Sequence, residues 1–160
     1  LLFQSPTCTP MDEATARTLA QIAGINIDEF AKEMFKAGSN LANKSVSEIC
    51  FQDFKEFHVN ELTFGVGQIN SMSSEELQEI REKVCPELPD VLKESGLDMV
   101  FFMLTNIVDQ STELLCCGGS ARQTVIDAFE LPEDTDQIVL KGVVSRKKQL
   151  IPTLVSELQQ

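Results

Sequence analysis

Apolar residues recur with two different periods along this 160-residue chain, and these periods predict both helices and strands. A spacing of three or four residues gives a helix one apolar face, whereas alternation or an unbroken β-branched and aromatic run is typical of a strand. Helical spacing covers residues 10–23, 28–36, 45–50, 74–84 with a continuation to 94, 121–129 and 150–158. Strand patterns cover residues 51–57, 62–70, 99–108, 114–117 and 137–144. Interleaved elements of this kind predict an α/β fold, with a mixed sheet of about five strands flanked by helices and preceded by an N-terminal helical segment.

Capping signals support the ends of two of these helices. Thr9 precedes Pro10 and an acidic first turn, and Gly24 follows the last apolar position, so a helix is expected between them. Ser73 and Glu76 have the spacing of a capping box, which predicts a helix that starts at residue 74.

Composition and charge mainly exclude certain classes of partner. The formal net charge is -12, and a nucleic-acid backbone would be repelled by everything except a local basic patch, so nucleic acid is not an expected partner. No run approaches the ~18 to 20 apolar residues of a membrane span, and no charged leader precedes an apolar segment. We therefore expect a soluble, cytoplasmic protein without a membrane partner.

Cysteine and histidine usage argues against a disulfide framework and against a metal centre. The five cysteines form no CxxC pair and have no regular spacing, so we expect reduced and mostly buried thiols. The single histidine, His58, lies in a turn-like stretch and is expected at the surface rather than in catalysis. A zinc or two-metal centre usually combines several histidines with carboxylates, so no metal site is expected in this chain.

The basic run Arg146-Lys147-Lys148 is the clearest candidate chemistry, because it follows Ser145 between a predicted strand and a predicted helix. Unpaired amides and the positive end of the helix dipole lie at such a junction, and together with Arg146 and Lys147 they would favour a phosphate. The alternative is a solvated turn, since charge runs usually face solvent. Cations at a helix start cost stability unless an anion or a carboxylate answers them, so both interpretations stay open on the residues alone.

Two further features have a structural and a functional interpretation. Lys55 lies between Phe54 and Glu56 in a predicted strand, so its side chain is either aimed at a cleft or an ordinary surface lysine. The Gly118-Gly119-Ser120 turn precedes a helix but lacks the GxxxxGK[ST] and GxGxxG spacings of phosphate loops. We therefore interpret it as a tight strand-to-helix connection.

Motifs spread over nearly the whole chain follow one known order. They are residues 5–9 (SPTCT), 22–24 (IAG), 34–38 (MFKAG), 53–57 (DFKEF), 101–108, and 142–149 (GVVSRKKQ) followed by Ile151-Pro152. In this order they resemble the interdomain linker, two helices, lysine-bearing strand, central strand and closing motif of the family II inorganic pyrophosphatases, members of the DHH phosphoesterase superfamily. The resemblance is to their C-terminal domain, the DHH-associated domain of the second subtype.

The resemblance implies a division of the chain into two parts. Residues 1–9 would be a remnant of the last strand and the linker of a missing N-terminal metal-binding domain, and residues 10–160 would be the C-terminal substrate-binding domain. In the family, manganese or cobalt ions are held by the N-terminal DHH domain and magnesium accompanies the substrate, so this chain would hold no metal. The DHH domain of the same parent chain would be its partner, and self-association into a homo-oligomer is left open.

The resemblance also assigns site residues. The family's substrate-binding residues fall on Lys55, Arg146 and Lys147, which would bind pyrophosphate or phosphate, whereas no catalytic residue or metal ligand of the family has a counterpart here, and His58 matches no motif. The chain is thus expected to hydrolyse pyrophosphate only together with the missing DHH domain. One departure is Asn106, where the family commonly has the aspartate of Thr-Asp-Ile; the change could alter local hydrogen bonding without touching the three cations.

Two alternatives are kept beside this hypothesis. One is a stand-alone phosphate- or nucleotide-binding regulatory module, and the other is the corresponding half of a short-chain polyphosphatase. A DHH domain encoded upstream would favour an enzyme half over a stand-alone module. Comparison of substrates would then separate pyrophosphate from short polyphosphates.

Overall fold

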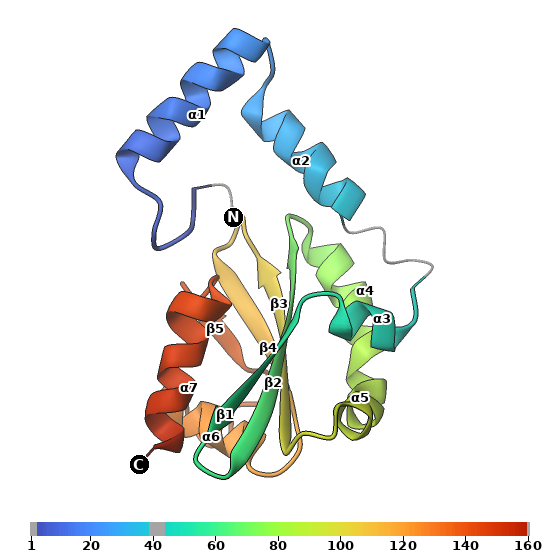
Figure 1. Ribbon diagram of the computed structural model, residues 1–160. Coiled ribbons are helices and arrows are strands. Elements are labelled where there is room, and N and C mark those ends of the chain that lie inside the picture. The colour runs from blue at the N-terminus through green and yellow to red at the C-terminus, as the bar shows by residue number, and fades with distance from the viewer. Residues whose placement is uncertain (1–2, 39–43, 160) are drawn as a thin grey trace.

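The computed structural model describes residues 3–38 and 44–159, and one five-stranded sheet lies at its centre (Figure 1). The strands are β1 (Phe54–Val59), β2 (Leu62–Ser71), β3 (Met99–Asn106), β4 (Ser111–Cys117) and β5 (Val139–Lys141), in the spatial order β1-β2-β3-β4-β5. β2 and β3 are parallel, whereas the other neighbours are antiparallel, so the predicted mixed sheet is confirmed. Leu1 and Leu2, at the start of the predicted strand remnant, lie outside the described residues.

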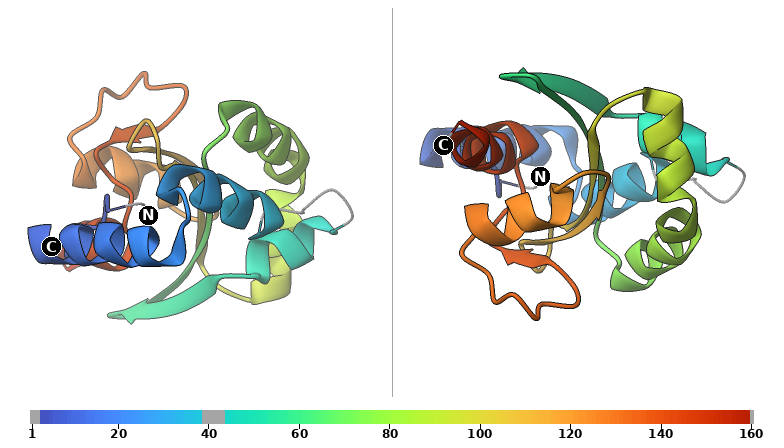
Figure 2. Two further views of the ribbon diagram at one scale, coloured as in Figure 1. Left: turned by 90° about the horizontal axis from the view of Figure 1, so that it is seen from above. Right: turned by 90° about the horizontal axis from the view of Figure 1, so that it is seen from below.

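Helices cover both faces of the sheet (Figure 2). On one face are α3 (Val46–Phe51), α4 (Ser74–Val84), the 3-10 turn η1 (Cys85–Glu87) and α5 (Leu88–Ser95). On the other are α6 (Ala121–Ala128), the π-helical turn η2 (Arg146–Leu150) and α7 (Ile151–Leu158). The predicted N-terminal helical segment is also confirmed: α1 (Pro10–Ala23) and α2 (Ile27–Gly38) stand apart from both layers (Figure 1). None of the described helices is long and apolar enough to cross a membrane.

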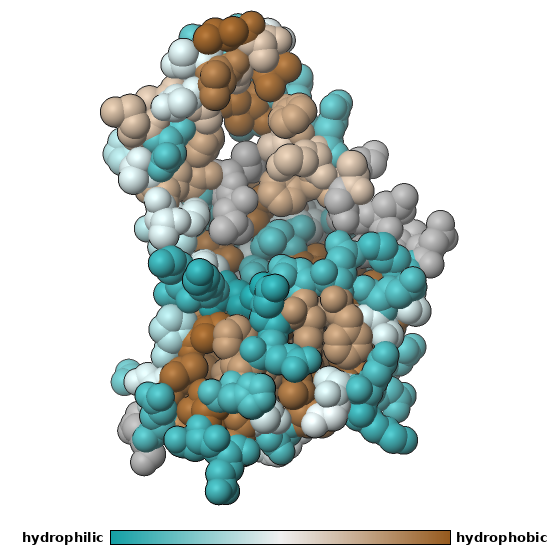
Figure 3. All heavy atoms as spheres, in the orientation of Figure 1, coloured by the Kyte–Doolittle hydropathy of each residue, from teal (hydrophilic) through white to brown (hydrophobic). Residues whose placement is uncertain are grey.

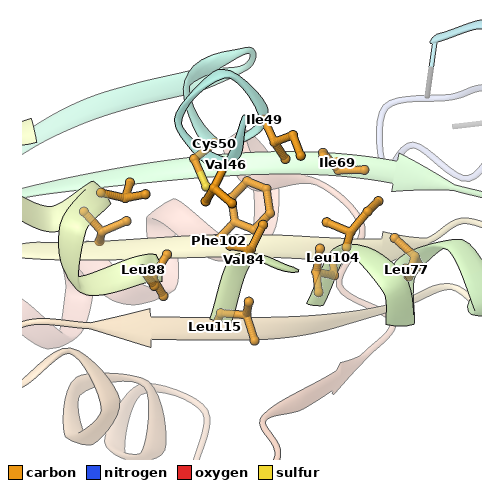
Figure 4. Packing of buried hydrophobic residues seen from close by; sticks show 13 residues of the cluster. Val46, Ile49, Cys50, Ile69, Leu77, Val84, Leu88, Phe102, Leu104 and Leu115 are labelled. Carbon is orange, nitrogen blue, oxygen red and sulfur yellow. The ribbon is translucent and has the colours of Figure 1, made fainter. Parts of the chain in front are cut away.

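β3 is buried along its whole length because helices cover it from both sides. Phe102 and Leu104 pack on one face with Ile49 and Val84 (Figure 4), whereas Phe101 packs on the other face. Since successive side chains of a strand point to opposite faces, a strand covered on both sides is mostly apolar, as residues 99–104 of β3 are. Each fully buried side chain of this size contributes roughly 1.5–3 kcal/mol to the folded state. The uninterrupted apolar run in the sequence has this cause.

The predicted strand 51–57 is wrong at its start, because Phe51 is the last residue of α3. Ser45 begins this helix by accepting a hydrogen bond from the amide of Glu48 at 3.2 Å, and the helix continues through Phe51. The Phe51 ring then packs edge-on against Phe54, with 4.9 Å between ring centroids. The apparent alternation of aromatic residues therefore combines a helix end with a strand start.

The last predicted strand, 137–144, is also too long. β5 ends at Lys141, and Gly142 turns the chain away with a φ of 76°. β4, in contrast, starts before the predicted residue 114, because Ser111 pairs with Lys141 of β5 and with Asn106 of β3. The edge of the sheet is thus shorter, and its neighbour longer, than the apolar pattern indicates.

Of the two capping predictions, one is confirmed and one is half right. Thr9 accepts a hydrogen bond from the Asp12 amide, and Gly24 ends α1 with a φ of 67°. Ser73 accepts from the amide of Glu76 at 3.2 Å, as predicted, but the Glu76 carboxylate accepts from the Ser71 hydroxyl instead of the Ser73 amide. The Ser71 hydroxyl in turn accepts from the Ser73 amide at 3.0 Å, so a serine replaces one arm of the capping box.

The turn at Gly118 is a close approach of two backbone segments. A Cβ atom at this position would lie 2.5 Å from the main-chain oxygen of Asp98 and 2.6 Å from a methyl carbon of Leu92, and φ is +91°. Only glycine tolerates both conditions without displacement of its neighbours. These contacts are consistent with the predicted tight strand-to-helix connection.

Gly118→Ala is therefore expected to destabilise the protein more than Gly96→Ala. Gly96 shares the positive φ, at +68°, but has open space around the position of a Cβ. We expect a loss of about 1 kcal/mol for Gly96→Ala from backbone strain, and about 1–3 kcal/mol more for Gly118→Ala from overpacking. Urea unfolding of both variants measures the difference. Equal losses would contradict the packing role of Gly118.

Candidate anion-binding site

The basic segment forms the first turn of the C-terminal helix. Arg146 is the first residue of η2, which α7 continues, and the Ser145 hydroxyl caps it by accepting from the Lys148 amide at 3.3 Å. The strand predicted to reach this point ends earlier, at Lys141, so residues 142–145 form a short connection. The cations therefore lie at a helix N-terminus, within the helix rather than in the junction before it.

The Gln149 side chain closes this connection into a fixed loop. Its Oε1 atom accepts from the amides of Val144 at 3.0 Å and Ser145 at 2.9 Å, and its Nε2 atom donates to the Gly142 carbonyl at 2.6 Å. One amide group thus satisfies three backbone groups of the turn that leads into the basic run.

A hydrogen-bond network anchors the same connection to the middle of the sheet. Thr112 donates to the Val143 carbonyl at 2.6 Å, and Gln68 donates to the Val144 carbonyl at 3.1 Å. Thr105 links the two, because its hydroxyl lies 2.8 Å from that of Thr112 and 3.1 Å from Gln68 Nε2. Both threonines are fully buried, so these bonds are protected from water. The position of the basic segment is thereby tied to β2, β3 and β4.

Arg146 is held by the chain's own acceptors. Its Nη1 atom donates to the main-chain oxygens of Asp53 at 2.7 Å and Val66 at 3.1 Å, and its Nη2 atom donates to Asp53 Oδ1 at 2.8 Å. Only 13% of its side chain is exposed. These bonds use three of the five guanidinium N–H groups, so at most two remain for an outside acceptor. The carboxylate that a cation at a helix start requires is therefore supplied by Asp53.

Lys55, on the edge strand β1, and Arg146 both adjoin Val66. Lys55 pairs with Val66 across β1 and β2, and the Val66 carbonyl is one of the acceptors of Arg146. Strand alternation puts Lys55 on the same face as Phe57, which packs in the cluster formed with α6 and α7. Lys55 and Arg146, predicted as site residues, are thus brought together from distant parts of the sequence.

Lys55 and Lys147 are the available cations of the site. Both residues are exposed, and in residues 3–38 and 44–159 neither ammonium group makes a hydrogen bond or an ion pair. Lys147 follows Arg146 directly in the helix. The arrangement combines one fixed guanidinium with two ammonium groups that can move towards an anion.

A pocket of about 230 Å³ at β4 lies elsewhere and does not have the same character. Two arginines line it, but Arg81 is paired with Glu113 at 2.7 Å. Arg122 donates to the main-chain oxygens of Thr135 and Asp136. Both arginines of this pocket already donate to oxygens of the chain itself. We therefore do not assign the predicted anion site to this pocket.

Residues 3–38 and 44–159 were expected to hold no metal. In the described part of the chain, no three His, Cys, Asp or Glu side chains are grouped so that they could hold a metal ion. His58 is exposed, as expected, but it lies within β1 and not in a turn.

The cysteines are free thiols, as predicted, but they are not mostly buried. Only Cys50 is buried; Cys85 is exposed, and the remaining three are intermediate. Desolvation by burial raises the pKa of Cys50 to about 12, and burial also raises the pKa of Cys116 to about 12. Both are protonated at neutral pH and therefore poor nucleophiles.

Asn106 forms a fully bonded turn at the end of β3. Its Oδ1 atom accepts from the amides of Val108 at 2.9 Å and Asp109 at 3.0 Å. Its Nδ2 atom donates to Ser74 Oγ at 2.9 Å and to Asp109 Oδ2 at 3.0 Å. The expected change in local hydrogen bonding thus takes a specific form: an amide can donate to the Asp109 carboxylate, whereas a carboxylate in its place could not.

The sequence did not reveal three residues that support the candidate site by hydrogen bonds, namely Asp53, Gln68 and Gln149. Asp53 and Gln149 belong to motifs noticed in the sequence, but no role followed for either. Asp53 and Arg146 are 93 positions apart, so their pairing depends on the tertiary fold. The one signal in the sequence for such a carboxylate was the positive charge at a predicted helix start, which is unfavourable unless an anion pairs with it.

Comparisons with known proteins agree over most of the chain. The DHHA2 domain matches residues 32–156. The cobalt-dependent inorganic pyrophosphatase of Clostridium perfringens is 40% identical over 154 residues, which cover 96% of this chain and 28% of that protein. The "Probable manganese-dependent inorganic pyrophosphatase" of Bacillus cereus is 36% identical over 159 residues, 99% of this chain and 51% of that protein.

A solved structure from Methanococcus jannaschii, assigned by name to the family II inorganic pyrophosphatases, has a TM-score of 0.80 to this chain at 35% identity. The match covers 99% of this chain and 51% of that one. The chain thus spans about half the length of the Bacillus and Methanococcus relatives, and less of the Clostridium protein.

Asp53→Ala is expected to lower the free energy of unfolding by about 0.5–1.5 kcal/mol, because it removes a charge-assisted bond from a nearly buried arginine. The estimate is modest because 51% of the Asp53 side chain is exposed. Glu56→Ala, which removes an exposed carboxylate from the adjoining strand β1, is the control. Urea unfolding measures both, and the difference should shrink at high salt. A larger effect of the control would contradict this pairing.

Asn106→Asp is expected to destabilise the protein by about 1–3 kcal/mol, because it loses two donated bonds and puts a carboxylate beside Asp109. The double variant Asn106→Asp/Asp109→Asn restores one donor and one acceptor at this contact. It should therefore be more stable than the single variant in urea unfolding. If the second change brings no recovery, the contact with Asp109 does not account for the loss.

Proposed function

The chain belongs to the DHHA2 domain family, and from that premise we propose that it is the substrate-binding half of a metal-dependent inorganic pyrophosphatase. In this proposal Lys55, Arg146 and Lys147 bind pyrophosphate. Hydrolysis to two phosphates requires a further half that carries the metal-binding DHH domain. Residues 1–9 would be the remnant and linker of that half, and residues 10–160 the substrate-binding domain.

Lys55 and Arg146 adjoin the same residue, since Lys55 pairs with Val66 in the sheet and Arg146 donates to the Val66 carbonyl, and this observation carries the proposal. In a chain with a formal net charge of -12, cations gathered at one helix start oppose the helix dipole and repel one another. Asp53 offsets only the Arg146 charge, since Lys55 and Lys147 have no ion pair among the described residues. A multiply charged anion would relieve the remaining repulsion.

The residue types suit pyrophosphate. Arg146, which is held in a fixed orientation, could offer its remaining N–H groups to phosphate oxygens, whereas the two lysines act as mobile point charges. The amides at the start of η2 and the helix dipole add a further favourable field for an anion. The role derived for this chain is to bind, orient and partly neutralise the substrate.

The residues that the structure describes do not fit a manganese or cobalt site. The described ranges contain no suitable group of ligands, although the names of the relatives include cobalt and manganese. We therefore assign those metals to the further half, with magnesium accompanying the substrate. No step of hydrolysis is assigned to the residues described here, and the chain alone is expected to be inactive.

A cytoplasmic location is part of the proposal. All five cysteines are free, as is usual where thiols are kept reduced, and no described helix could cross a membrane.

The test is a calorimetric titration of this chain with inorganic pyrophosphate. Lys55→Gln, Arg146→Gln and Lys147→Gln should each weaken binding about tenfold, because each removes one charge-assisted contact. Lys141→Gln, which removes an exposed lysine from β5, should leave the affinity within about twofold. Binding should weaken as salt rises. Equal effects of all four changes would show a nonspecific charge effect and overturn the site.

Hydrolysis is measured separately. The chain supplied with manganese, cobalt or magnesium should release no phosphate from pyrophosphate. Release by the chain alone would show that the further half is not required. Tighter binding of tripolyphosphate than of pyrophosphate would instead favour the polyphosphatase alternative.

A further inference from the structure

α1, α2 and the turn between them carry an apolar surface that the described part of the chain leaves uncovered. Its members are Met11, Leu19, Ile22, Ile25, Phe30 and Met34, which are between 44% and 79% exposed. We call it the α1–α2 surface. Figure 3 shows hydrophobic residues gathered at the end of the molecule that these helices form. In the rest of the described chain, the large apolar residues with comparable exposure are Leu62, Val108 and Val139.

The two helices bury small residues and expose large ones. Ala20 is the buried residue of α1, and Ala31 is buried in α2, whereas Ile22 is 79% exposed. Met11 and Ile22 lie three helical turns apart and so share a face, opposite Ala20. A helix packed on its own domain turns its large apolar residues inward. The outer face of α1 therefore has the composition of a contact surface.

The contact of α2 with the end of β2 and the start of α4 leaves a space. A pocket of about 230 Å³ opens between them, lined by Lys32 and Phe35 of α2 and by Ser71, Met72, Ser73 and Glu76. The DHHA2 match begins only at residue 32, so α1 and the start of α2 lie outside the matched domain. The match to the Methanococcus structure nevertheless covers 99% of this chain, and half of that protein is left for something else.

We propose that the α1–α2 surface docks against the further half that precedes this chain in the full-length protein. The proposal rests on that part of the proposed function which makes this chain one half of a longer enzyme, and not on the anion site. The relatives contain counterparts of nearly all of this chain together with about as much additional sequence. An exposed apolar patch beside a missing half is the kind of surface that an interface covers.

The test compares this chain with the full-length protein encoded by its gene, by amide hydrogen exchange. Exchange across residues 10–38 should be at least about tenfold slower in the full-length protein, because docking adds to the free energy of local opening. Exchange in β3 should change much less. Equal rates in α1 and α2, or a gene that encodes no further half, would overturn the proposal.

Two surface variants sharpen the comparison. In the full-length protein, Ile22→Ser and Phe30→Ser should restore fast exchange across residues 10–38. Val108→Ser, at a position that is 57% exposed on the sheet domain, should not. Because all three side chains are exposed, the variants should fold, which circular dichroism verifies.

A second copy of the chain is the competing occupant. If the 160-residue chain dimerises in sedimentation and Ile22→Ser makes it monomeric, while the full-length protein gains no protection, the proposal is wrong. Pyrophosphate titration of the same variants keeps the two proposals apart. Loss of the anion site would leave the exchange result intact, and loss of docking would leave pyrophosphate binding intact.

Discussion

β3 passes between two helical layers without an exposed residue, and this burial constrains the structure built around it. A polar group buried there needs a partner inside the protein, since leaving it unpaired costs more than most single interactions contribute. Thr105 meets this requirement through Thr112 and Gln68. The same two partners bind the carbonyls of Val143 and Val144. The hydrogen bonds that the buried Thr105 requires thereby also fix the position at which the basic segment enters its helix.

The charges of the candidate site divide into two kinds. Arg146 is bound to Asp53 and to main-chain oxygens, so its cost at a helix N-terminus is offset within the protein. Lys55 and Lys147 are exposed cations in an otherwise acidic chain. Arg146 offers hydrogen-bond donors in a fixed direction, and the two lysines add a positive electrostatic potential around it. Asp53 and the main-chain oxygens thus neutralise one cation of the basic run within the protein, and anion binding by the other cations is our proposal.

The fold class could be predicted from the spacing of apolar residues, because most helices and strands bury one face and expose the other. Where the sheet needs both faces buried, as in β3, the apolar run was unmistakable. The pattern failed at Phe51, where a capped helix and a strand share one aromatic alternation. For the candidate site, Lys55, Arg146 and Lys147 were predicted from sequence motifs. The ion pair of Arg146 with Asp53 could not be predicted in this way, because it joins segments that only the tertiary fold brings together.

Two of the three acceptors of Arg146 are main-chain oxygens, those of Asp53 and Val66. Every amino acid supplies such an oxygen, so no side-chain substitution at either position can delete it. The direction of this arginine is consequently encoded in the path of the main chain just before β1 and in the middle of β2. Homologous chains could therefore vary at Val66 and still aim the guanidinium alike, provided that the register between β1 and β2 is preserved.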